Sequence, residues 1–272
     1  IPIVMGANIG TSITNTLVSI GHLRVKTELQ RAFAAATVHD MFNLLAVVVF
    51  LPLQLSFNFI GASAAFMSGI FREVGGTTFT SPLKIIVNPT VDLIVSLVGG
   101  NGIIAIILAL AILFASLSYI VKLMKSLVMR KLSVFFDKVI FRSPLIGIFF
   151  GMFITAIVQS SSVTTSLIVP LAGAGLITLE QAFPYTLGAN IGTTITALMA
   201  SLVTENPTAV TVAFAHFLFN VFGIIVFLPL KFIPIAMARR LAFYSIQNKL
   251  VPFAYVLVVF IIIPLTLIFL VR

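Results

Sequence analysis

Long, almost uninterrupted apolar runs constrain this chain more than any other feature. Two of them, Ile103–Ile120 and Phe253–Val271, each contain 18 or more residues. A run of about 18 or more apolar residues can cross the hydrocarbon core of a bilayer as a helix. The whole chain is 60% hydrophobic and only 8% charged, whereas soluble domains are about 45–50% apolar and about 25% charged. Lipid must therefore cover much of its surface.

The same runs decide the type of secondary structure. Backbone polar groups in lipid need partners within the protein, which leaves a helix bundle or a closed barrel. A barrel would show short segments of alternating polarity, and the runs here are continuous. We therefore predict an all-α polytopic membrane protein in a lipid bilayer. The net charge of +9 comes from bases clustered between the runs, which is typical of cytoplasmic loops and does not indicate nucleic-acid binding. The absence of cysteine excludes disulfides and thiolate metal sites.

An internal duplication organises the chain. Gly6–Thr14 (Gly-Ala-Asn-Ile-Gly-Thr-Ser-Ile-Thr) recurs as Gly188–Thr196, 182 residues later. His39–Asn43 recurs as His216–Asn220, 177 residues later, with His and Asn at the same ends. Both copies of this His-to-Asn block are followed by the same sequence, Val-Phe-Leu-Pro-Leu, at Val49–Leu53 and at Val226–Leu230. Two ordered blocks indicate two related repeats.

A polar motif, Gln159–Ser162 (Gln-Ser-Ser-Ser), lies between two short apolar arms, 144–158 and 163–174. Each arm is shorter than the about 20 residues that cross a bilayer. One continuous helix would place four polar side chains at mid-membrane. We therefore predict a re-entrant hairpin with this motif at its tip. Its counterpart in the first repeat would fall before Ile1, so we expect one complete repeat and the latter part of another, which alone should not transport.

Loop charges predict opposite orientations for the two repeats. The runs Ile1–Ile20 and Ala182–Leu202 are each expected to break at their Gly-Ala-Asn-Ile-Gly sequence, because glycine permits unwound backbone. Bases follow the first run: Arg24, Lys26 and Arg31. The loop after the second run, 203–207, has Glu205 and no base, so it is expected outside. Inverted repeats of broken helices are typical of secondary transporters, with the site near the midplane.

The expected domain organisation has four segments. They are 1–58, the latter part of the first inverted repeat; 59–143, a linker with amphipathic and scaffold helices and a basic cytoplasmic loop; 144–235, the complete second repeat; and 236–272, a C-terminal amphipathic segment and scaffold helix. A membrane helix is predicted over Ala32–Leu53, and a loop with short helices over Phe57–Ser81.

These motifs resemble the type II sodium-dependent phosphate cotransporters over nearly the whole chain. The resemblance is carried by Gln159–Ser162, Gly188–Thr193, Gly6–Ser12 and Val38–Asn43. It implies sodium-coupled uptake of inorganic phosphate by alternating access, with sodium as the coupling ion, no other cofactor and no enzymatic activity. The short, cysteine-free region between the repeats favours a bacterial member in the cytoplasmic (inner) membrane. A homodimer is left open.

Candidate ligands follow from the chemistry of the two ions. Phosphate needs several converging donors, which hydroxyls, amides and helix ends supply. Sodium, a hard cation, takes oxygens from hydroxyls, amides, carbonyls and carboxylates. The predicted phosphate ligands are Ser160, Ser161, Ser162, Asn8, Thr11, Ser12, Asn190 and Thr193. The predicted sodium ligands are Gln159, Asp40, Asn43, Thr164, Thr194 and Asn220. The resemblance also places Asp40 and Asn43 in a sodium-binding segment, and no transition metal is expected.

Several alternatives stay open at this stage. Gly-Ala-Asn-Ile-Gly could be a helix-packing motif, and single hydroxyls could bond to their own helix. Asp40, near the inner end of its predicted helix, could be interfacial, and His39 and His216 could be structural hydrogen-bonders. The carrier could take another small anion, such as a dicarboxylate or sulfate. A hydrolase using a serine with His39 and Asp40 is disfavoured, because adjacent helical residues point about 100° apart.

Overall fold

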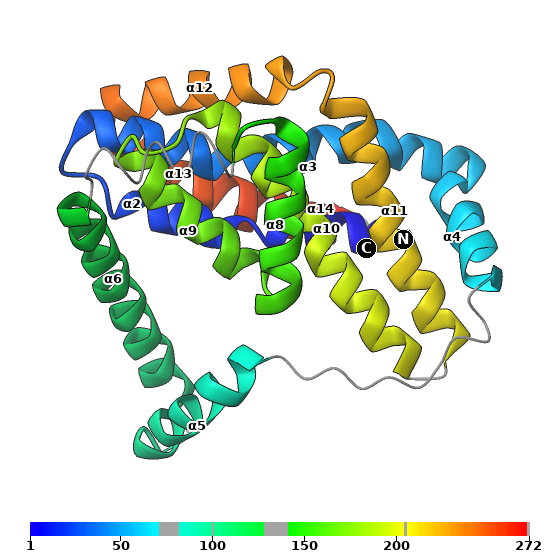
Figure 1. The fold of residues 1–272 in the computed structure, drawn as a ribbon, viewed down its shortest axis with the longest axis horizontal. Coiled ribbons are helices and arrows are strands. Elements are labelled where there is room, and N and C mark those ends of the chain that lie inside the picture. The colour runs from blue at the N-terminus through cyan, green and yellow to red at the C-terminus, as the bar shows by residue number, and fades with distance from the viewer. Residues whose placement is uncertain (71–81, 100, 128–140, 204–205, 271–272) are drawn as a thin grey trace.

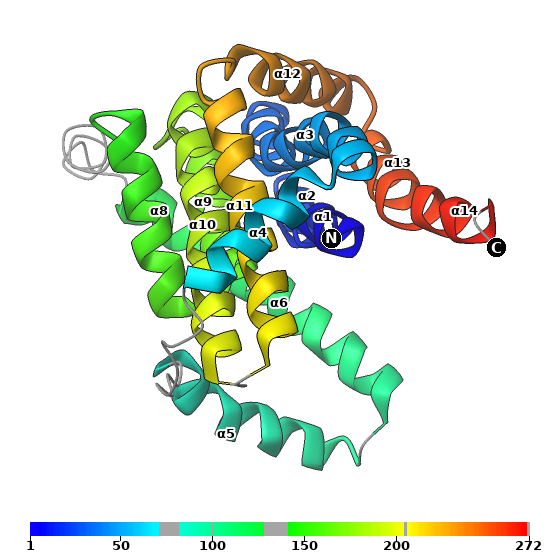
Figure 2. The same ribbon diagram turned by 90° about the vertical axis from the view of Figure 1, so that its right-hand side faces the viewer.

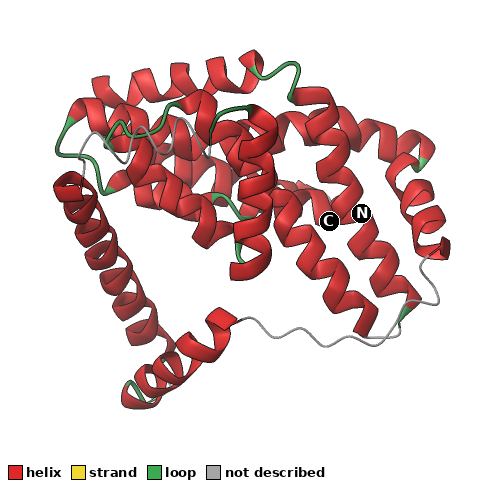
Figure 3. Cartoon of the chain, viewed as in Figure 1, coloured by secondary structure: helices red, strands yellow, loops and turns green. Residues whose placement is uncertain are grey.

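The protein is described by a computed structural model covering residues 1–70, 82–99, 101–127, 141–203 and 206–270. Every regular element within these ranges is a helix, which confirms the all-α prediction (Figures 1 and 3). The elements are α1 (Pro2–Gly10), α2 (Ile13–Ile20), α3 (Lys26–Phe57), α4 (Phe59–Ile70), α5 (Pro82–Leu97), α6 (Gly102–Leu127), α8 (Pro144–Val158), α9 (Ser161–Gly173), α10 (Leu179–Val203), α11 (Pro207–Phe227), α12 (Phe232–Gln247), α13 (Val251–Leu257), a π-helical turn (Val258–Ile262) and α14 (Ile263–Leu270).

Three helical segments in the described part are long and apolar enough to cross a membrane. They are Pro2–Ile20, Lys26–Phe57 and Pro207–Phe227. The predicted span Ile103–Val121 lies in α6. The predicted span Phe253–Val271 lies in α13, the π-helical turn and α14, except for Val271, which is outside the described residues. Length and apolar composition thus support an integral membrane protein.

Helix α3 lies at the centre of the packed helices, with α12 along one side and α2, α9 and α10 also against it (Figure 2). Its Phe42 ring is fully buried and meets Phe183 of α10 and Phe227 of α11 edge-on, with ring centroids 6.2 Å apart in both pairs. Gly223 of α11 makes room for it, because an added Cβ there would lie 2.9 Å from Phe42 Cζ. Polar residues on α3 are therefore held in the interior.

The close packing of α8 against α10 corrects one prediction. Helix α10 runs unbroken from Leu179 to Val203, so the predicted break in the second Gly-Ala-Asn-Ile-Gly sequence is wrong. Its two glycines face the α8 backbone: an added Cβ on Gly188 would overlap Ile148 O, and one on Gly192 would lie 2.6 Å from Met152 O. The alternative of a small-residue packing motif is therefore correct for this repeat.

The first repeat does break, but slightly later than predicted. Helix α1 ends at Gly10 and α2 begins at Ile13, so the break lies at Thr11 and Ser12 and not within Gly6–Gly10. The two repeats have nearly the same local sequence, so tertiary contacts must decide the difference. An added Cβ on Gly10 would meet nothing within 4 Å among the described residues, in contrast to Gly192. Among the described residues, no helix packs against Gly10 as α8 packs against Gly192.

Two other segments begin or end at residues different from those predicted. Helix α3 extends beyond the predicted Ala32–Leu53 at both ends and stops at Asn58, which has a left-handed φ of 49°. A single helix, α4, occupies much of the predicted loop over Phe57–Ser81, and residues 71–81 lie outside the described residues. Helices α5 and α6 lead away from the helices around α3 (Figures 1 and 2).

Candidate functional site

The predicted hairpin break lies between α8 and α9, which are separated by Gln159 and Ser160 only. Gln159 has a left-handed φ of 58°, which ends α8 and turns the chain. Ser160 accepts a hydrogen bond from Val163 N at 3.3 Å and so caps the start of α9. The arms contain 15 and 13 residues, each fewer than the about 20 needed to cross a bilayer. The predicted break is confirmed, while its re-entrant path stays a prediction.

The tip of this hairpin contacts the break in the first repeat. Ser162 Oγ donates to Thr11 O at 3.1 Å, which joins α9 to the turn between α1 and α2. Within the hairpin, Thr155 Oγ1 and Thr164 Oγ1 lie 2.7 Å apart and link the two arms. Thr155 and Thr164 are fully buried, whereas Thr11 is exposed. The predicted phosphate ligands of the two repeats therefore meet at the outer edge of the site.

The break at Thr11 and Ser12 leaves helix-end carbonyls that need other partners. Thr11 Oγ1 donates to Asn8 O at 2.9 Å, and Ser12 Oγ donates to Ile9 O at 2.8 Å. Asn8 O also accepts from Asn43 Nδ2 of α3 at 2.8 Å. The carbonyls at the break are thus paired with nearby hydroxyls, and Asn8 O is also paired with α3.

The four asparagines of the duplicated blocks form one buried asparagine cluster. Its members are Asn8, Asn43, Asn190 and Asn220, each at most 4% exposed. Asn43 joins the repeats by bonding to Asn8 O and by accepting from Asn190 Nδ2 at 3.2 Å. Asn220 Nδ2 donates to Asn8 Oδ1 at 3.3 Å. Asn220 Oδ1 has no hydrogen-bond partner among the described residues, which is uncommon for a buried acceptor.

His39 connects this cluster to α2 and α9. Its Nε2 lies 2.7 Å from Asn190 Oδ1, and its Nδ1 lies 3.5 Å from Asn15 Nδ2. Thr165 of α9 donates to Asn15 Oδ1 at 3.0 Å. The structural role considered for His39 from the sequence is therefore correct in part, and its partners belong to the candidate site. His216 of the second repeat makes no side-chain hydrogen bond within the described residues.

Asp40 forms a second polar group beside the cluster. It is fully buried, and it lies near the middle of the 32-residue helix α3 and not near its end. Tyr255 of α13 donates to Asp40 Oδ2 at 2.9 Å, and Thr16 donates to the same oxygen at 3.4 Å. The Ser12 side chain also lies beside the carboxylate. Asp40 Oδ1 has no hydrogen-bond partner in the described part of the chain.

Three predicted ligands are not drawn into these contacts. Thr193 and Thr194 donate to carbonyls of their own helix, Ala189 O at 3.2 Å and Ile191 O at 2.8 Å. This is the ordinary behaviour of hydroxyls in membrane helices. Gln159 contributes its backbone N–H, which donates to Thr155 O at 2.6 Å. Their roles as ion ligands stay predictions.

Sequence reasoning missed several residues that the structure places here: Asn15, Thr16, Thr155, Thr165 and Tyr255. One signal was available. Asn15 is, like Asn8, an amide side chain within the apolar run Ile1–Ile20. A search for residues shared by the two repeats overlooks Asn15 and Thr16, because the second repeat has Ala197 and Leu198 at the equivalent positions. In the same way it has Phe217 at the position equivalent to Asp40. The second repeat therefore has no counterpart of Asn15, Thr16 and Asp40 in its sequence.

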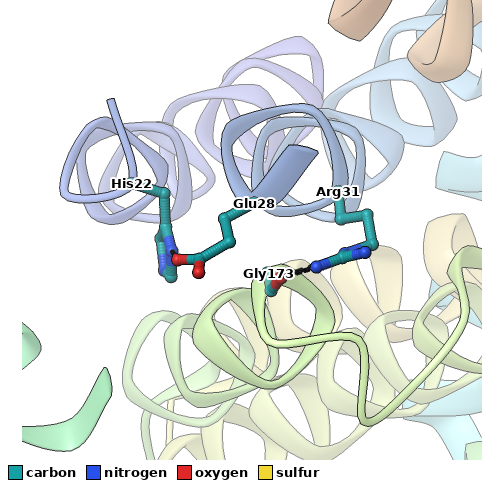
Figure 4. A network of polar contacts seen from close by, with 4 residues as sticks. All are labelled: His22, Glu28, Arg31 and Gly173. Atoms are coloured by element: carbon teal, nitrogen blue, oxygen red, sulfur yellow. Dashed lines mark hydrogen bonds and ion pairs between the residues drawn. The ribbon is translucent and has the colours of Figure 1, made fainter. Parts of the chain in front are cut away.

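A contact at the far end of α9 fixes the base of the hairpin (Figure 4). Arg31 of α3 donates from Nε and Nη2 to Gly173 O, at 3.0 and 2.7 Å. A cation at a helix C-terminus is favourable for the helix dipole. The His22 ring lies over Gly173, since an added Cβ there would be 2.8 Å from His22 Cε1, and His22 Nδ1 is 3.3 Å from Glu28 Oε2.

A cavity of about 500 Å³ opens next to this contact, among α3, α10 and α12. Arg31, Glu180 and Arg239 line it, and the last two form an ion pair. None of the predicted phosphate or sodium ligands lines this cavity. The cavity and the asparagine cluster are therefore separate features.

Comparisons with known proteins identify the family of the chain. The profile of the Na+/Pi-cotransporter family matches residues 112–270. Sodium-dependent phosphate transport protein 2B of Homo sapiens is 31% identical over 98% of this chain and 52% of its own length. Protein 2A of Rattus norvegicus is 32% identical over 97% of this chain and 54% of its own length. The chain thus spans about half the length of the curated relatives it matches. No solved structure matches it.

Proposed function

The chain belongs to the Na+/Pi-cotransporter family, and from this premise we propose that it forms part of a carrier that uses a sodium gradient to take up inorganic phosphate. The observation that carries the proposal is the asparagine cluster beneath the Gln159–Ser162 tip. Side chains from both repeats meet there through hydrogen bonds between α1, α3, α10 and α11. Two related halves that share one buried polar centre are what an alternating-access carrier needs.

Phosphate binds, in this proposal, between the hairpin tip and the break in the first repeat. Ser160, Ser161 and Ser162 supply hydroxyls and the start of α9, where backbone N–H groups and the helix dipole favour an anion. The other proposed phosphate ligands are Asn8, Thr11, Ser12, Asn190 and Thr193. The bond from Ser162 to Thr11 O at 3.1 Å is weak enough to be replaced when an anion enters.

Sodium is held deeper, by oxygens. Asp40 Oδ1 and Asn220 Oδ1 are buried acceptors without a hydrogen-bond partner among the described residues, and hard cations favour such oxygens. Asn43, Gln159, Thr164 and Thr194 complete the proposed sodium ligands.

Coupling follows from charge. Opposite unit charges about 4 Å apart attract by about 4 kcal/mol at an effective dielectric constant near 20. That energy corresponds to about a thousandfold in affinity, so neither ion binds well without the other.

The remaining proposals concern architecture and location. The repeats, 1–58 and 144–235, are proposed to lie in opposite orientations and to carry the moving site. Segment 59–143 forms the linker and scaffold. Segment 236–272 adds a scaffold helix, and it also reaches the site through the bond from Tyr255 to Asp40. The proposed location is the cytoplasmic membrane of a bacterium, and a second copy of the chain is a further proposed partner.

The arrangement of His39 and Asp40 does not support the hydrolase alternative. A serine nucleophile needs a base within hydrogen-bond reach. Both ring nitrogens of His39 face asparagines, and Asp40 bonds to Thr16 and Tyr255 and not to His39. The serine beside Asp40 is Ser12, whose hydroxyl donates to Ile9 O, and His39 bonds to no serine among the described residues.

Uptake of labelled phosphate by the protein at its natural length, reconstituted into liposomes, tests the proposal. An inward sodium gradient should drive accumulation, and a potassium gradient should not. Ser161→Leu should abolish uptake, because Ser161 is 5% exposed and has no room for a larger side chain. Ser162→Ala, which keeps the size, should lower phosphate affinity about tenfold.

Ser166→Ala is the matched control, since Ser166 lies on the same helix and donates to its own Val163 O. Competition by arsenate, sulfate and succinate separates the substrate classes. Inhibition by succinate but not by arsenate would replace phosphate with a dicarboxylate as the substrate.

A further inference from the structure

A continuous series of hydrogen bonds crosses the site, and one end of it fixes the direction of every donor. That end is Asn8 O, a backbone carbonyl that can only accept. Asn43 therefore presents Nδ2 to it, at 2.8 Å, and turns Oδ1 toward Asn190. Asn190 must donate from Nδ2 to that oxygen, at 3.2 Å. Asn190 Oδ1 then faces the next residue as an acceptor.

The next residue is His39, whose proton position follows. Nε2 lies 2.7 Å from Asn190 Oδ1, so Nε2 carries the proton and donates. In the neutral ring Nδ1 is then an acceptor. It faces Asn15 Nδ2 at 3.5 Å, and Asn15 Oδ1 accepts from Thr165 Oγ1 at 3.0 Å. Every donor in the series is thus matched with an acceptor.

The other neutral tautomer does not fit. With the proton on Nδ1, Nε2 would accept, and Asn190 would have to turn its Nδ2 toward His39. Asn190 Oδ1 would then face Asn43, which would direct its own Oδ1 at Asn8 O across a separation of 2.8 Å. Two facing acceptors in a buried place are strongly unfavourable. The backbone of the first repeat therefore determines the tautomer of His39.

The series joins the hairpin to both repeats. It starts on α9 at Thr165, passes through α2 and α3 to α10, and returns through α3 to α1. Thr165 Oγ1 also lies 2.6 Å from Ser161 O at the tip, so one hydroxyl proton is shared between the tip and Asn15. A shift of α9 relative to α2 changes this sharing and hence the support that Asn15 gives to His39.

We propose that His39 is a positioning residue that fixes the Asn190 amide and, through it, keeps the oxygen of Asn43, a proposed sodium ligand, available to sodium, and that ties this orientation to the place of α9. The inference rests on the proposed function, because it concerns how the proposed ligands are held. Asn43 Oδ1 has two lone pairs and uses one in the series, for the bond from Asn190. The second remains for a cation. Reversal of the Asn43 amide would present N–H groups to the ion instead.

Three substitutions test the proposal in sodium-driven phosphate uptake. His39→Gln places an amide Nε2 where the ring Nε2 was, and so keeps the donor to Asn190. In His39→Asn the shorter side chain places its amide nitrogen only where the ring Nδ1 was. His39→Leu has no nitrogen at either position. The sodium concentration for half-maximal uptake should change less than about twofold in His39→Gln and rise about tenfold in the other two. The phosphate KM at saturating sodium should change less than about threefold in all three.

Controls separate positioning from packing and from the proposed function. His216→Leu alters the counterpart in the second repeat and should leave the sodium dependence unchanged. If all three His39 variants shift sodium and phosphate dependence equally, or change only thermal stability, His39 is a packing residue and the proposal is overturned. If the unmodified protein shows no sodium-driven uptake, the proposed function fails instead. The tautomer is then still measured by ¹⁵N NMR of labelled histidine, where an Nδ1–H signal from His39 would overturn the inference.

Discussion

The two copies of Gly-Ala-Asn-Ile-Gly offer a matched test of helix packing. Gly192→Ala adds a Cβ that would lie 2.6 Å from Met152 O and 2.7 Å from Thr155 Cβ. Ordinary contacts between carbon atoms are about 3.5–4.0 Å, so α8 and α10 must separate by roughly 1 Å. Gly10→Ala at the equivalent place in the first repeat meets nothing within 4 Å among the described residues. The same substitution should therefore have different effects in the two repeats.

The size of the difference can be worked out. Overpacking costs about 1–3 kcal/mol, and replacing glycine by alanine in a helix returns up to about 1 kcal/mol. The propensity gain is at least as large for Gly192 inside α10 as for Gly10 at the end of α1, so the two variants should differ by at most about 1–3 kcal/mol. Gly192→Ala should also reduce uptake, because it displaces Thr155, which bonds to Thr164 beside the tip.

Thermal unfolding in detergent and sodium-driven uptake in liposomes measure the two effects. Gly192→Ala should unfold several degrees below Gly10→Ala and should transport more slowly. Equal unfolding temperatures and equal uptake would refute the reasoning, because they would mean that α8 and α10 do not approach closely at this glycine.

Further predictions concern charge and the base of the hairpin. Asp40→Asn removes the buried carboxylate and should raise the sodium concentration for half-maximal uptake at least about tenfold. The control Asp92→Asn, on exposed α5, should leave that concentration unchanged. Equal effects of the two substitutions would show that Asp40 is not part of the sodium site. Tyr255→Phe should cost about 1.5–3 kcal/mol of stability in sodium-free buffer and less with sodium bound, because the ion replaces part of the lost bond. Arg31→Ala should increase amide hydrogen exchange around Gly173 and Arg31→Lys less so, because only arginine makes two bonds there; unchanged exchange would show that this contact does not hold α9.

The parts of the fold that the sequence predicts are those set by local chemistry and by repetition. The apolar runs identify helices, and the undersized arms around Gln159–Ser162 locate the hairpin break, because a polar tetrapeptide cannot lie in the middle of a lipid-facing helix. The duplication also marks the asparagines that meet, although the sequence divided them between a phosphate site and a sodium site. Asn8, Asn43, Asn190 and Asn220 are all members of repeated blocks, and all four join one cluster.

Features that depend on distant partners are not predictable in this way. The first Gly-Ala-Asn-Ile-Gly sequence precedes a break, whereas the second continues as helix against α8, although the residues are the same. Tyr255 reaches Asp40 across 215 positions of sequence, and no local pattern marks that contact. Asn15 and Thr16 were concealed because the second repeat carries Ala197 and Leu198 in their places.

A density map of the protein at its natural length, prepared in sodium phosphate, tests the central claim most directly. The account predicts density for a tetrahedral anion within hydrogen-bond distance of the Ser160–Ser162 tip and Asn8, with compact density beside Asp40 Oδ1 or Asn220 Oδ1. The same map would contradict the account if the anion lay only in the cavity lined by Arg31 and Arg239 while the asparagine cluster kept its present hydrogen bonds.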